Sequence, residues 1–233
     1  MTENAHQAKR APDGTGYAKG EKTRDRILAA GISVFGRNGF QGATTRQIAD
    51  TAGVNLPALQ YYFGGKKGLY LACAQMIADR HRGHMAPVGS EVYAKLERDL
   101  SPSEARHMLR ALFFDLAEFL TGASEQEDWS LFVSREIAQP GEAFDILYEH
   151  LWQPGITMAA DLIARIHGRR RRTQQDLAQA MMMISSIGPF QSGREVAGRV
   201  LGARADSETV LDMVRQALTA QIEQMGRDGD NGK

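Results

Sequence analysis

Cysteine and long hydrophobic runs are both scarce in this sequence. One of its 233 residues is a cysteine, Cys73, which excludes an internal disulfide framework and a zinc site of the CxxC type. The longest uncharged stretch, 177–193, is interrupted by Gly188-Pro189 and is too short to span a bilayer. Residues 1–20 contain no apolar segment of the secretory type. We therefore expect a cytoplasmic protein that does not contact a membrane.

An excess of either charge sign is also absent, since 28 Lys and Arg residues balance 28 Asp and Glu residues. The charges are nevertheless unevenly distributed. Residues 1–70 carry ten basic and five acidic side chains, whereas residues 71–168 carry eight basic and fifteen acidic ones. A basic first third followed by an acidic middle indicates that the N-terminal region meets a polyanion. Because the excess is modest, charge alone leaves nucleic-acid binding and chance equally open.

Sustained β alternation is missing, and apolar residues instead recur at helical spacing along most of the chain. This spacing predicts an all-α fold. Helices are predicted at about 23–38, 45–52, 55–62, 67–81, 102–120, 128–137, 144–166 (bent or split at Pro154-Gly155), 173–187 and 207–224.

The most specific signals lie in the stretch that starts at Thr44, TTRQIADTAGVNLPALQYYFGGKKGL. Thr44 and Gln47 form a capping box for a short helix, and Gly53 directly after that helix permits a left-handed turn. Asn55 is placed to cap a second short helix that has Pro57 in its first turn. Two short helices joined in this way predict a helix-turn-helix, whose second helix enters the major groove of DNA.

These motifs resemble the TetR family of bacterial transcriptional regulators. The resemblance rests on the helix at 23–38, Thr45, Ile48-Ala49, Ala52-Gly53-Val54, Tyr61-Tyr62-Phe63, Gly65-Lys66 and Leu69. A second resemblance, to the CerR/CecR-type C-terminal domain, rests on Ser134-Arg135-Glu136, Pro140, Ala143–Leu147, Gly188–Gln191 and Gly198–Leu201. Together they imply an N-terminal three-helix helix-turn-helix DNA-binding domain and a larger helical domain for ligand binding and dimerisation.

The resemblance also implies domain ranges and a function. A disordered arm is expected at 1–20, the DNA-binding domain at 21–66, the ligand-sensing and dimerisation domain at 67–226, and a disordered tail at 227–233. The implied function is that of a ligand-responsive, sequence-specific repressor, which a small-molecule effector releases from an inverted-repeat operator in double-stranded DNA. A homodimer through the C-terminal helices would present two recognition helices, and no cofactor or metal is expected.

The family's DNA-contacting positions can be carried over residue by residue. Base-reading positions fall on Thr45, Arg46, Leu56, Pro57, Ala58 and Gln60, phosphate-contacting positions on Thr44, Tyr61, Tyr62 and Lys66, and Asn55 completes the DNA-binding set. Gln60 can pair with adenine, and many family members have tyrosine there, so the preferred DNA sequence should differ. The ring of Tyr62 could instead pack in the core. Lys67 stands where an acidic residue is common, which should strengthen non-specific attraction to DNA.

A ligand site is suggested by apolar and aromatic side chains on the predicted helices of the larger domain. The candidate lining residues are Phe113, Phe114, Trp129, Phe132, Phe144, Trp152, Met182 and Phe190. Rings and flexible methionines suit such a pocket, although the same stripes fit an ordinary hydrophobic core. Arg135, Glu136 and His150 are nearby polar groups that could orient a ligand or form surface ion pairs.

Enzymatic readings have little support in the sequence. His81 and His84, with Cys73, lack a further ligand at a spacing that would close a metal site. The run 64–68 lacks the first glycine and the Ser/Thr of a phosphate-binding loop. No pairing of a nucleophile with a base is evident, so no enzymatic activity is expected.

Two other basic segments are interpreted as solvated rather than as DNA contacts. The arginines at 169–172 follow a glycine at a helix end and are expected in an exposed loop. The basic residues of the N-terminal arm could reach a minor groove, but solvation is favoured. The main alternative function is a helical small-molecule-binding protein whose helix-turn-helix no longer binds DNA; a ligand-independent architectural DNA binder is a second rival.

Overall fold

The computed structural model describes residues 14–122, 125–191, 193–202 and 208–226. These residues form helices joined by turns, with no strand among them, so the all-α prediction is confirmed. In chain order the elements are α1 (Gly14–Gly42), α2 (Thr45–Ala52), α3 (Leu56–Phe63), α4 (Lys66–Leu96), α5 (Pro102–Thr121), α6 (Glu125–Ala138), α7 (Phe144–Leu147), a π-helical turn η1 (Tyr148–Trp152), α8 (Gln153–Ile166), α9 (Gln174–Gln191), α10 (Arg194–Leu201) and α11 (Glu208–Gln224).

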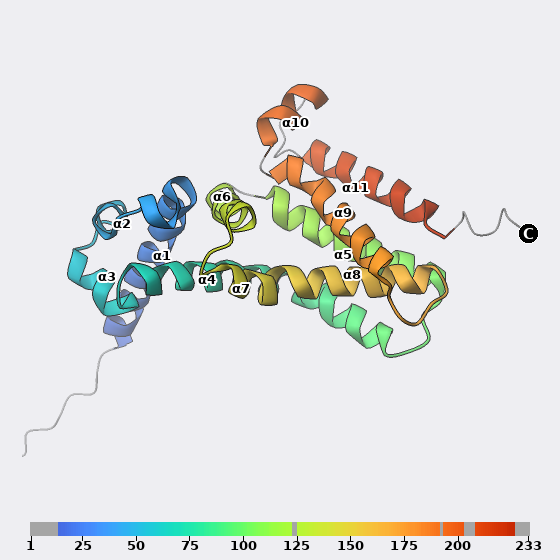
Figure 1. Ribbon diagram of the computed structural model, residues 1–233, viewed down its shortest axis with the longest axis horizontal. Helices are drawn as coiled ribbons and strands as arrows, with labels where there is room; N and C mark the ends of the chain where they lie inside the picture. Colours follow the sequence, from blue (N-terminus) through green and yellow to red (C-terminus); the bar gives the residue numbers. More distant parts are fainter. Residues whose placement is uncertain (1–13, 123–124, 192, 203–207, 227–233) are drawn as a thin grey trace, which may run out of the picture.

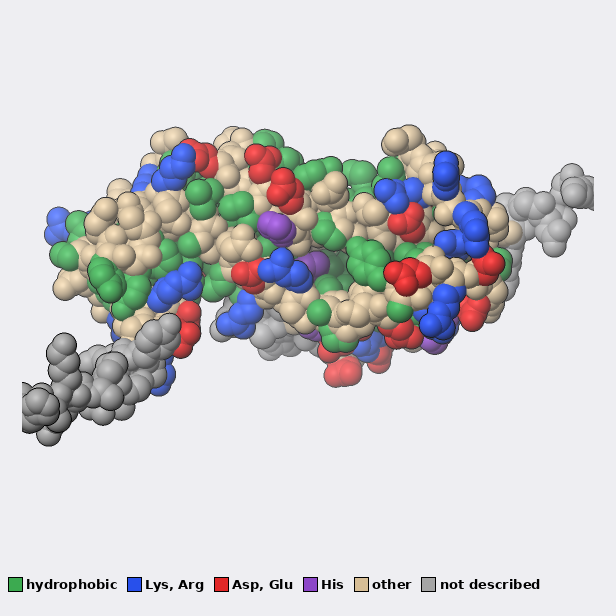
Figure 2. Space-filling view, turned by 90° about the horizontal axis from the view of Figure 1, so that it is seen from below, with side chains coloured by type: hydrophobic (Ala, Val, Ile, Leu, Met, Phe, Trp, Pro, Cys, Tyr) green, Lys and Arg blue, Asp and Glu red, His purple; other side chains and the backbone are tan. Residues whose placement is uncertain are grey.

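The molecule is elongated, and its two ends are joined by the long helix α4 (Figure 1). Helices α1 to α3 gather at one end, where α4 begins. Helices α5, α8, α9 and α11 make up the other end, which we call the body, and α6 lies between the two groups. On the face shown in Figure 2, acidic and basic side chains alternate over the body. No helix in the described part of the chain combines the length and apolar character needed to cross a bilayer.

Two separate hydrophobic cores stabilise these ends. The boundary between them does not fall at residue 66, where the first predicted domain ends. The N-terminal core joins α1, α2, α3 and the first half of α4, but it also includes Phe132 of α6 and Leu147 of α7. The C-terminal core joins the second half of α4, through Val88 and Val92, to the body helices. Helices α6 and α7 therefore pack with the N-terminal helices α1 to α3, although they follow α5 in the sequence.

Several helix limits differ from the predicted ones. Helix α4 continues through Pro87 to Leu96 instead of ending near His81, and α9 continues through Pro189 to Gln191. Helix α10 was not predicted. Helix α1 has a kink at Gly39, with a φ of 71°, directly after the predicted end of the first helix at 38, and the chain then continues as helix to Gly42.

The structure describes only part of the two terminal segments that were expected to be disordered. Residues 14–20 belong to α1, so the expectation of a disordered arm is wrong for them. Residues 1–13 and the tail at 227–233 lie outside the described residues. The predicted first residue of the last helix, Ser207, also lies outside them.

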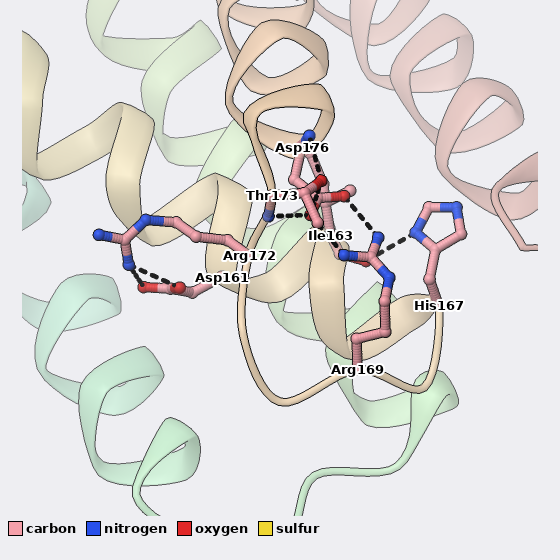
Figure 3. A network of polar contacts seen from close by, with 7 residues as sticks. All are labelled: Asp161, Ile163, His167, Arg169, Arg172, Thr173 and Asp176. Atoms are coloured by element: carbon pink, nitrogen blue, oxygen red, sulfur yellow. Dashed lines mark hydrogen bonds and ion pairs between the residues drawn. The ribbon is translucent and has the colours of Figure 1, made fainter.

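The arginines at 169–172 lie in a loop between α8 and α9, as expected, with Arg170, Arg171 and Arg172 exposed and Arg169 half-buried. Arg169 forms an ion pair with Asp176, Arg170 with Asp99, and Arg172 with Asp161. The pairs made by Arg169 and Arg172 are bidentate and close the loop between α8 and α9 (Figure 3).

Candidate nucleic-acid interface

The helix-turn-helix is built by the local caps that the sequence predicts. The backbone N–H of Gln47 donates to Thr44 Oγ1 at 3.1 Å, and the Thr44 N–H donates to Gln47 Oε1 at 3.0 Å, which completes the capping box of α2. Gly53 ends α2 in the left-handed region, with a φ of 60°. Asn55 Oδ1 accepts from the Ala58 N–H at 3.0 Å and caps α3. Each of these predictions is confirmed.

A contact that the sequence did not suggest closes the turn between α2 and α3. The guanidinium group of Arg26, on α1, donates to the carbonyl oxygens of Ala52 and Gly53, each at 2.7 Å through Nη2. These carbonyls belong to the C-terminal end of α2, where the partial negative charge of the helix favours a cation. Arg26 therefore fixes the angle at which α3 leaves α2.

Helix α3 presents a mostly exposed outer face. Leu59 is buried in the N-terminal core, whereas Leu56, Pro57 and Gln60 are exposed, and Tyr61 has an exposed fraction of 82%. Asn55, Thr44 and Arg46 are exposed as well, and Thr45 is half-buried. The structure thus brings the predicted set together on one end of the molecule, on α2, α3 and the start of α4 (Figure 1).

Two members of the predicted set are less available than expected. Ala58 is half-buried, and Tyr62 packs its ring against the N-terminal core, as the alternative for this residue anticipated. Tyr62 also contacts the ring of Tyr61 edge-on, with the centroids 5.1 Å apart. The exposed ring of Tyr61 is therefore supported from behind by Tyr62.

The lysines at the start of α4 are both engaged within the chain. Lys66 Nζ lies 4.7 Å from the ring centroid of Phe40 and donates to the Gln41 carbonyl oxygen at 3.4 Å. Lys67 forms an ion pair with Glu142, in the segment that leads into α7. Glu142 thus offsets part of the charge of Lys67, and the stronger non-specific attraction to DNA stays a prediction.

The predicted ligand-lining residues do not converge on a single cavity. Phe113 is buried in the C-terminal core, and Phe114 and Phe190 pack against it. Phe132 is buried in the N-terminal core, with Trp129 and Trp152 packed against it. Phe144 contacts Trp152, with centroids 5.4 Å apart, and Met182 is 73% exposed on α9. Their helical stripes were read correctly as apolar faces, but these faces belong to different cores.

An open groove of about 570 Å³ includes one of the predicted residues. It lies between α5 and α11 and is lined by Phe114, Asp212, Arg215, Gln216, Thr219 and Ala220. The Arg215 guanidinium stands 5.7 Å from the ring centroid of Phe114 and pairs with Glu118 at 3.1 Å. The groove therefore carries a cation whose charge is already offset.

A cluster of rings lies where α4, α5 and α6 meet. His81 and His84 of α4 contact Phe119 of α5, with centroids 5.2 and 5.1 Å away, and Phe119 lies 6.3 Å from Trp129 of α6. Burial lowers the pKa of His81 to about 4, and the neighbouring His84 adds to this effect, so the ring of His81 is neutral near pH 7. The described residues contain no group of three or more potential ligands that could hold a metal ion.

Helix α6 is fixed to the DNA-binding end by buried and polar contacts. The Arg135 guanidinium donates to the carbonyl oxygens of Gly36 and Arg37 in α1. Glu136, buried in α6, accepts a hydrogen bond from the Tyr70 hydroxyl of α4 and another from the Gly141 N–H at 3.1 Å. Burial and the Glu136 carboxylate both raise the pKa of Tyr70, which keeps the hydroxyl a donor. Arg135 and Glu136 thus make structural contacts within the chain instead of the surface ion pair considered for them, and their ligand role stays a prediction.

Comparison with known proteins agrees with this geometry. A family model described as "Bacterial regulatory proteins, tetR family" matches residues 27–73, and the C-terminal domain of the HTH-type transcriptional dual regulator CecR matches residues 105–225. The CecR protein of Shigella flexneri is 31% identical over 208 residues, which cover 88% of this chain and 92% of that protein. The chain belongs to the TetR family. It is therefore a DNA-binding transcriptional regulator with a CecR-type C-terminal domain.

Solved structures share the fold of this TetR-family regulator. A TetR-like transcriptional regulator from Rhodococcus sp. RHA1 superposes with a TM-score of 0.59 at 22% identity, over 96% of this chain and all of the other. FadR of Bacillus subtilis, in complex with stearoyl-CoA, superposes with a TM-score of 0.53 at 16% identity, over 84% of this chain and 97% of the other. At these identities the likeness extends to the fold alone.

Proposed function

We propose that this regulator is a homodimeric repressor that binds an inverted-repeat operator and leaves it when a small-molecule effector binds. The observation that carries the proposal is the exposed face of α3, with Gln60 and Tyr61 pointing outward from a turn held by Arg26. Such a face fits a recognition helix that reads base edges and phosphates. The related Shigella protein is named a dual regulator, so activation at some promoters is compatible with the same DNA-binding mode.

A dimer would pair two such helices at the spacing of successive major grooves. Support for a dimer face on α9 and α11 comes from their outward side chains, since Met181 and Met182 on α9 and Met213 on α11 are exposed. Exposed methionines on adjacent long helices suit a four-helix contact between two copies.

The experiment that tests the repressor proposal is selection of bound fragments from random DNA by protein that has been unfolded, dialysed and refolded to remove any effector. Enrichment of one inverted repeat by the refolded dimer is the expected result. A protein that folds and dimerises but enriches no sequence would instead favour a small-molecule-binding protein whose helix-turn-helix serves only as a scaffold.

Two substitutions in the proposed interface should have different consequences. Gln60→Ala should relax preference at one base pair and cost about 1–3 kcal/mol on the selected site, because a base-edge contact is lost. Lys66→Ala should weaken selected and random DNA alike and reduce the slope of log affinity against log salt by about 1, because a phosphate contact is lost. Filter binding at several salt concentrations separates the two effects. Equal proportional losses on both DNAs for both variants would contradict this division of roles.

The effector signal is proposed to pass through α6. Its N-terminal part carries Trp129, in the ring cluster with Phe119, and its C-terminal part holds α1 through Arg135. An effector that separates Phe119 from Trp129 would therefore move α6 against α1 and change the spacing of the two recognition helices. Such an effector must bind the two states with different affinity, so operator DNA and effector weaken each other reciprocally.

Arg135→Ala tests this route without knowledge of the effector. The substitution leaves the carbonyl oxygens of Gly36 and Arg37 without their donor, so we expect a loss of about 1–3 kcal/mol in the free energy of unfolding and an operator affinity lowered about tenfold. Arg135→Lys should recover part of both, and Ser134→Ala, at an exposed neighbouring position, should change neither. Calorimetry and operator titration give the two quantities. Unchanged operator affinity in a destabilised Arg135→Ala protein would argue against α6 as the route.

A further inference from the structure

Helix α10 carries its larger apolar side chains on the outside. Val196 is 67% exposed and Val200 78% exposed, and Leu201 is exposed as well, whereas the small side chain of Ala197 is buried. An amphipathic helix of a monomer has the opposite arrangement, with its larger apolar residues turned inward. Contiguous exposed apolar side chains of this kind mark a surface that another molecule covers.

The position of α10 indicates which molecule that is. The helix packs on α9 and stands beyond the body at the end of α9, before the chain returns as α11 (Figure 1). It therefore connects the two helices whose outer faces carry Met181, Met182 and Met213 and form the proposed dimer face. The exposed apolar residues of α10 therefore adjoin α9, one of the two helices of that face.

The size of the two-helix face leaves room for this contribution. Helices α9 and α11 contain 18 and 17 residues, so they are roughly 27 and 26 Å long, and at a width of ~10 Å each their outer faces project roughly 500 Å². A stable interface covers about 800 Å² on each partner. The accessible surface of these faces is larger than their projection, so α9 and α11 form the main part of a contact of this size and α10 would add apolar area to it.

We propose that α10 is an arm that packs against the second subunit, so that the surface of that subunit covers Val196 and Val200 of the arm. This inference rests on the proposed dimer and adds an element to it. The charges of α10 do not favour an anionic lipid surface as the alternative, because Arg199 pairs with Glu195 on the same helix at 2.8 Å. In a symmetric dimer this contact occurs twice, once for the arm of each subunit, so four valines are removed from water.

Engineered cysteines can test the position of the arm, because the native Cys73 is fully buried and burial raises the pKa of its thiol, which leaves it unreactive. Val200→Cys and Tyr93→Cys place a thiol at two positions that are exposed in the single subunit, where the side chains of Val200 and Tyr93 have exposed fractions of 78% and 54%. Tyr93 lies on α4, which packs against α1, α5 and α8. In protein that sediments as a dimer, we expect iodoacetamide to modify Val200→Cys at least ten times more slowly than Tyr93→Cys.

A second measurement excludes an arm that folds back on its own subunit. The double variant Val196→Ser/Val200→Ser should raise the dimer dissociation constant at least tenfold in sedimentation equilibrium, whereas Tyr93→Ser should leave it unchanged. Equal alkylation rates at both sites of a dimeric protein would overturn the arm while leaving the dimer in place. Slow alkylation with an unchanged dissociation constant would also overturn it, and a monomeric wild-type protein would overturn both the arm and the proposed dimer.

Discussion

Replacing Gly68 with alanine is expected to abolish operator binding. A Cβ at this position would lie 1.9 Å from the carbonyl oxygen of Phe63, the last residue of α3. This oxygen is backbone and cannot rotate away, and the chain between the two residues is already a tight reversal through Gly64 and Gly65, whose φ values are 67° and 120°. Helix α3 would therefore have to move away from α4, which carries the recognition side chains out of register with the major groove.

The same clash should also destabilise the protein. Forcing an extra methyl group into a close backbone contact costs roughly 1–3 kcal/mol or more, and here no flexible side chain is available to yield. Urea unfolding followed by circular dichroism measures the stability, and an electrophoretic mobility shift on the selected operator measures binding. The mobility shift should be measured under conditions in which the unfolding curve shows the variant to be folded, so that loss of binding is not merely loss of fold.

Gly83→Ala, in the same helix, is the matched control. A Cβ on Gly83 would meet nothing within 4 Å, so alanine should stabilise α4 by roughly 0.5–1 kcal/mol and leave operator binding unchanged. If Gly68→Ala bound the operator as tightly as Gly83→Ala does, the close approach of α3 to α4 would not be what positions the recognition helix.

The helix-turn-helix could be predicted in detail because its signals are local. Thr44, Gln47, Gly53 and Asn55 act within three or four residues of themselves, and the structure gives each the predicted partner or conformation. Capping and turn formation depend on short sequence separations and small sets of residue types, so they can be recognised before any tertiary contact is known.

Helix ends near proline could not be predicted in the same way. A proline inside a helix removes a hydrogen bond and normally ends it, which is why the helix at 173–187 was expected to stop before Pro189. The predicted end of α4 near His81 also lies before a proline, Pro87. In α4, burial of Val88 and Val92 in the C-terminal core favours continuing the helix past Pro87. Tertiary packing of this kind overrides local preference. Helix α10 was missed for a related reason, since its apolar residues face outward.

The long-range contacts of the site had no signal in the sequence. Helical spacing shows that Phe113 and Phe132 lie on apolar faces, but not that they enter two different cores. Similarly, Arg26 and Arg135 are ordinary surface-type residues until the fold places helix-end carbonyl oxygens within their reach. A periodic pattern identifies the face of a helix, and only the fold identifies the neighbour of that face.

Asp176→Asn is expected to be among the most destabilising substitutions outside the hydrophobic cores. The carboxylate of Asp176 is 1% exposed and accepts from both terminal nitrogens of Arg169 at 2.7 Å, and from the N–H and hydroxyl of Thr173 at 2.7 and 2.8 Å (Figure 3). An amide turns one acceptor oxygen into a donor that faces these donors. The charge of Arg169 would lose its partner, but its side chain is 38% exposed and solvent screens it, so we expect a loss of about 1–3 kcal/mol in the free energy of unfolding.

Asp161→Asn is the control, because it breaks an ion pair at a partly exposed place, in which Nη1 of Arg172 donates to both carboxylate oxygens of Asp161. Solvent screens this pair, so the cost should stay below about 1 kcal/mol. Chemical unfolding of both variants at pH 7 checks the contrast. Similar losses for the two would mean that burial of Asp176 adds little.

The same network predicts how stability depends on acid. Hydrogen bonds from Arg169, with those from Thr173, lower the pKa of Asp176 from its ordinary value of 3.8 to about 2 in the folded protein. The unfolded chain therefore takes up this proton first as the pH falls, so the stabilisation is complete above about pH 4 and is lost as the pH falls through 2. The difference in unfolding free energy between wild type and Asp176→Asn should shrink by about 2 kcal/mol between pH 5 and pH 2. Measured against Asp161→Asn, which corrects for the general effect of acid, a difference that stayed constant over this range would show that Asp176 is not held ionised by Arg169.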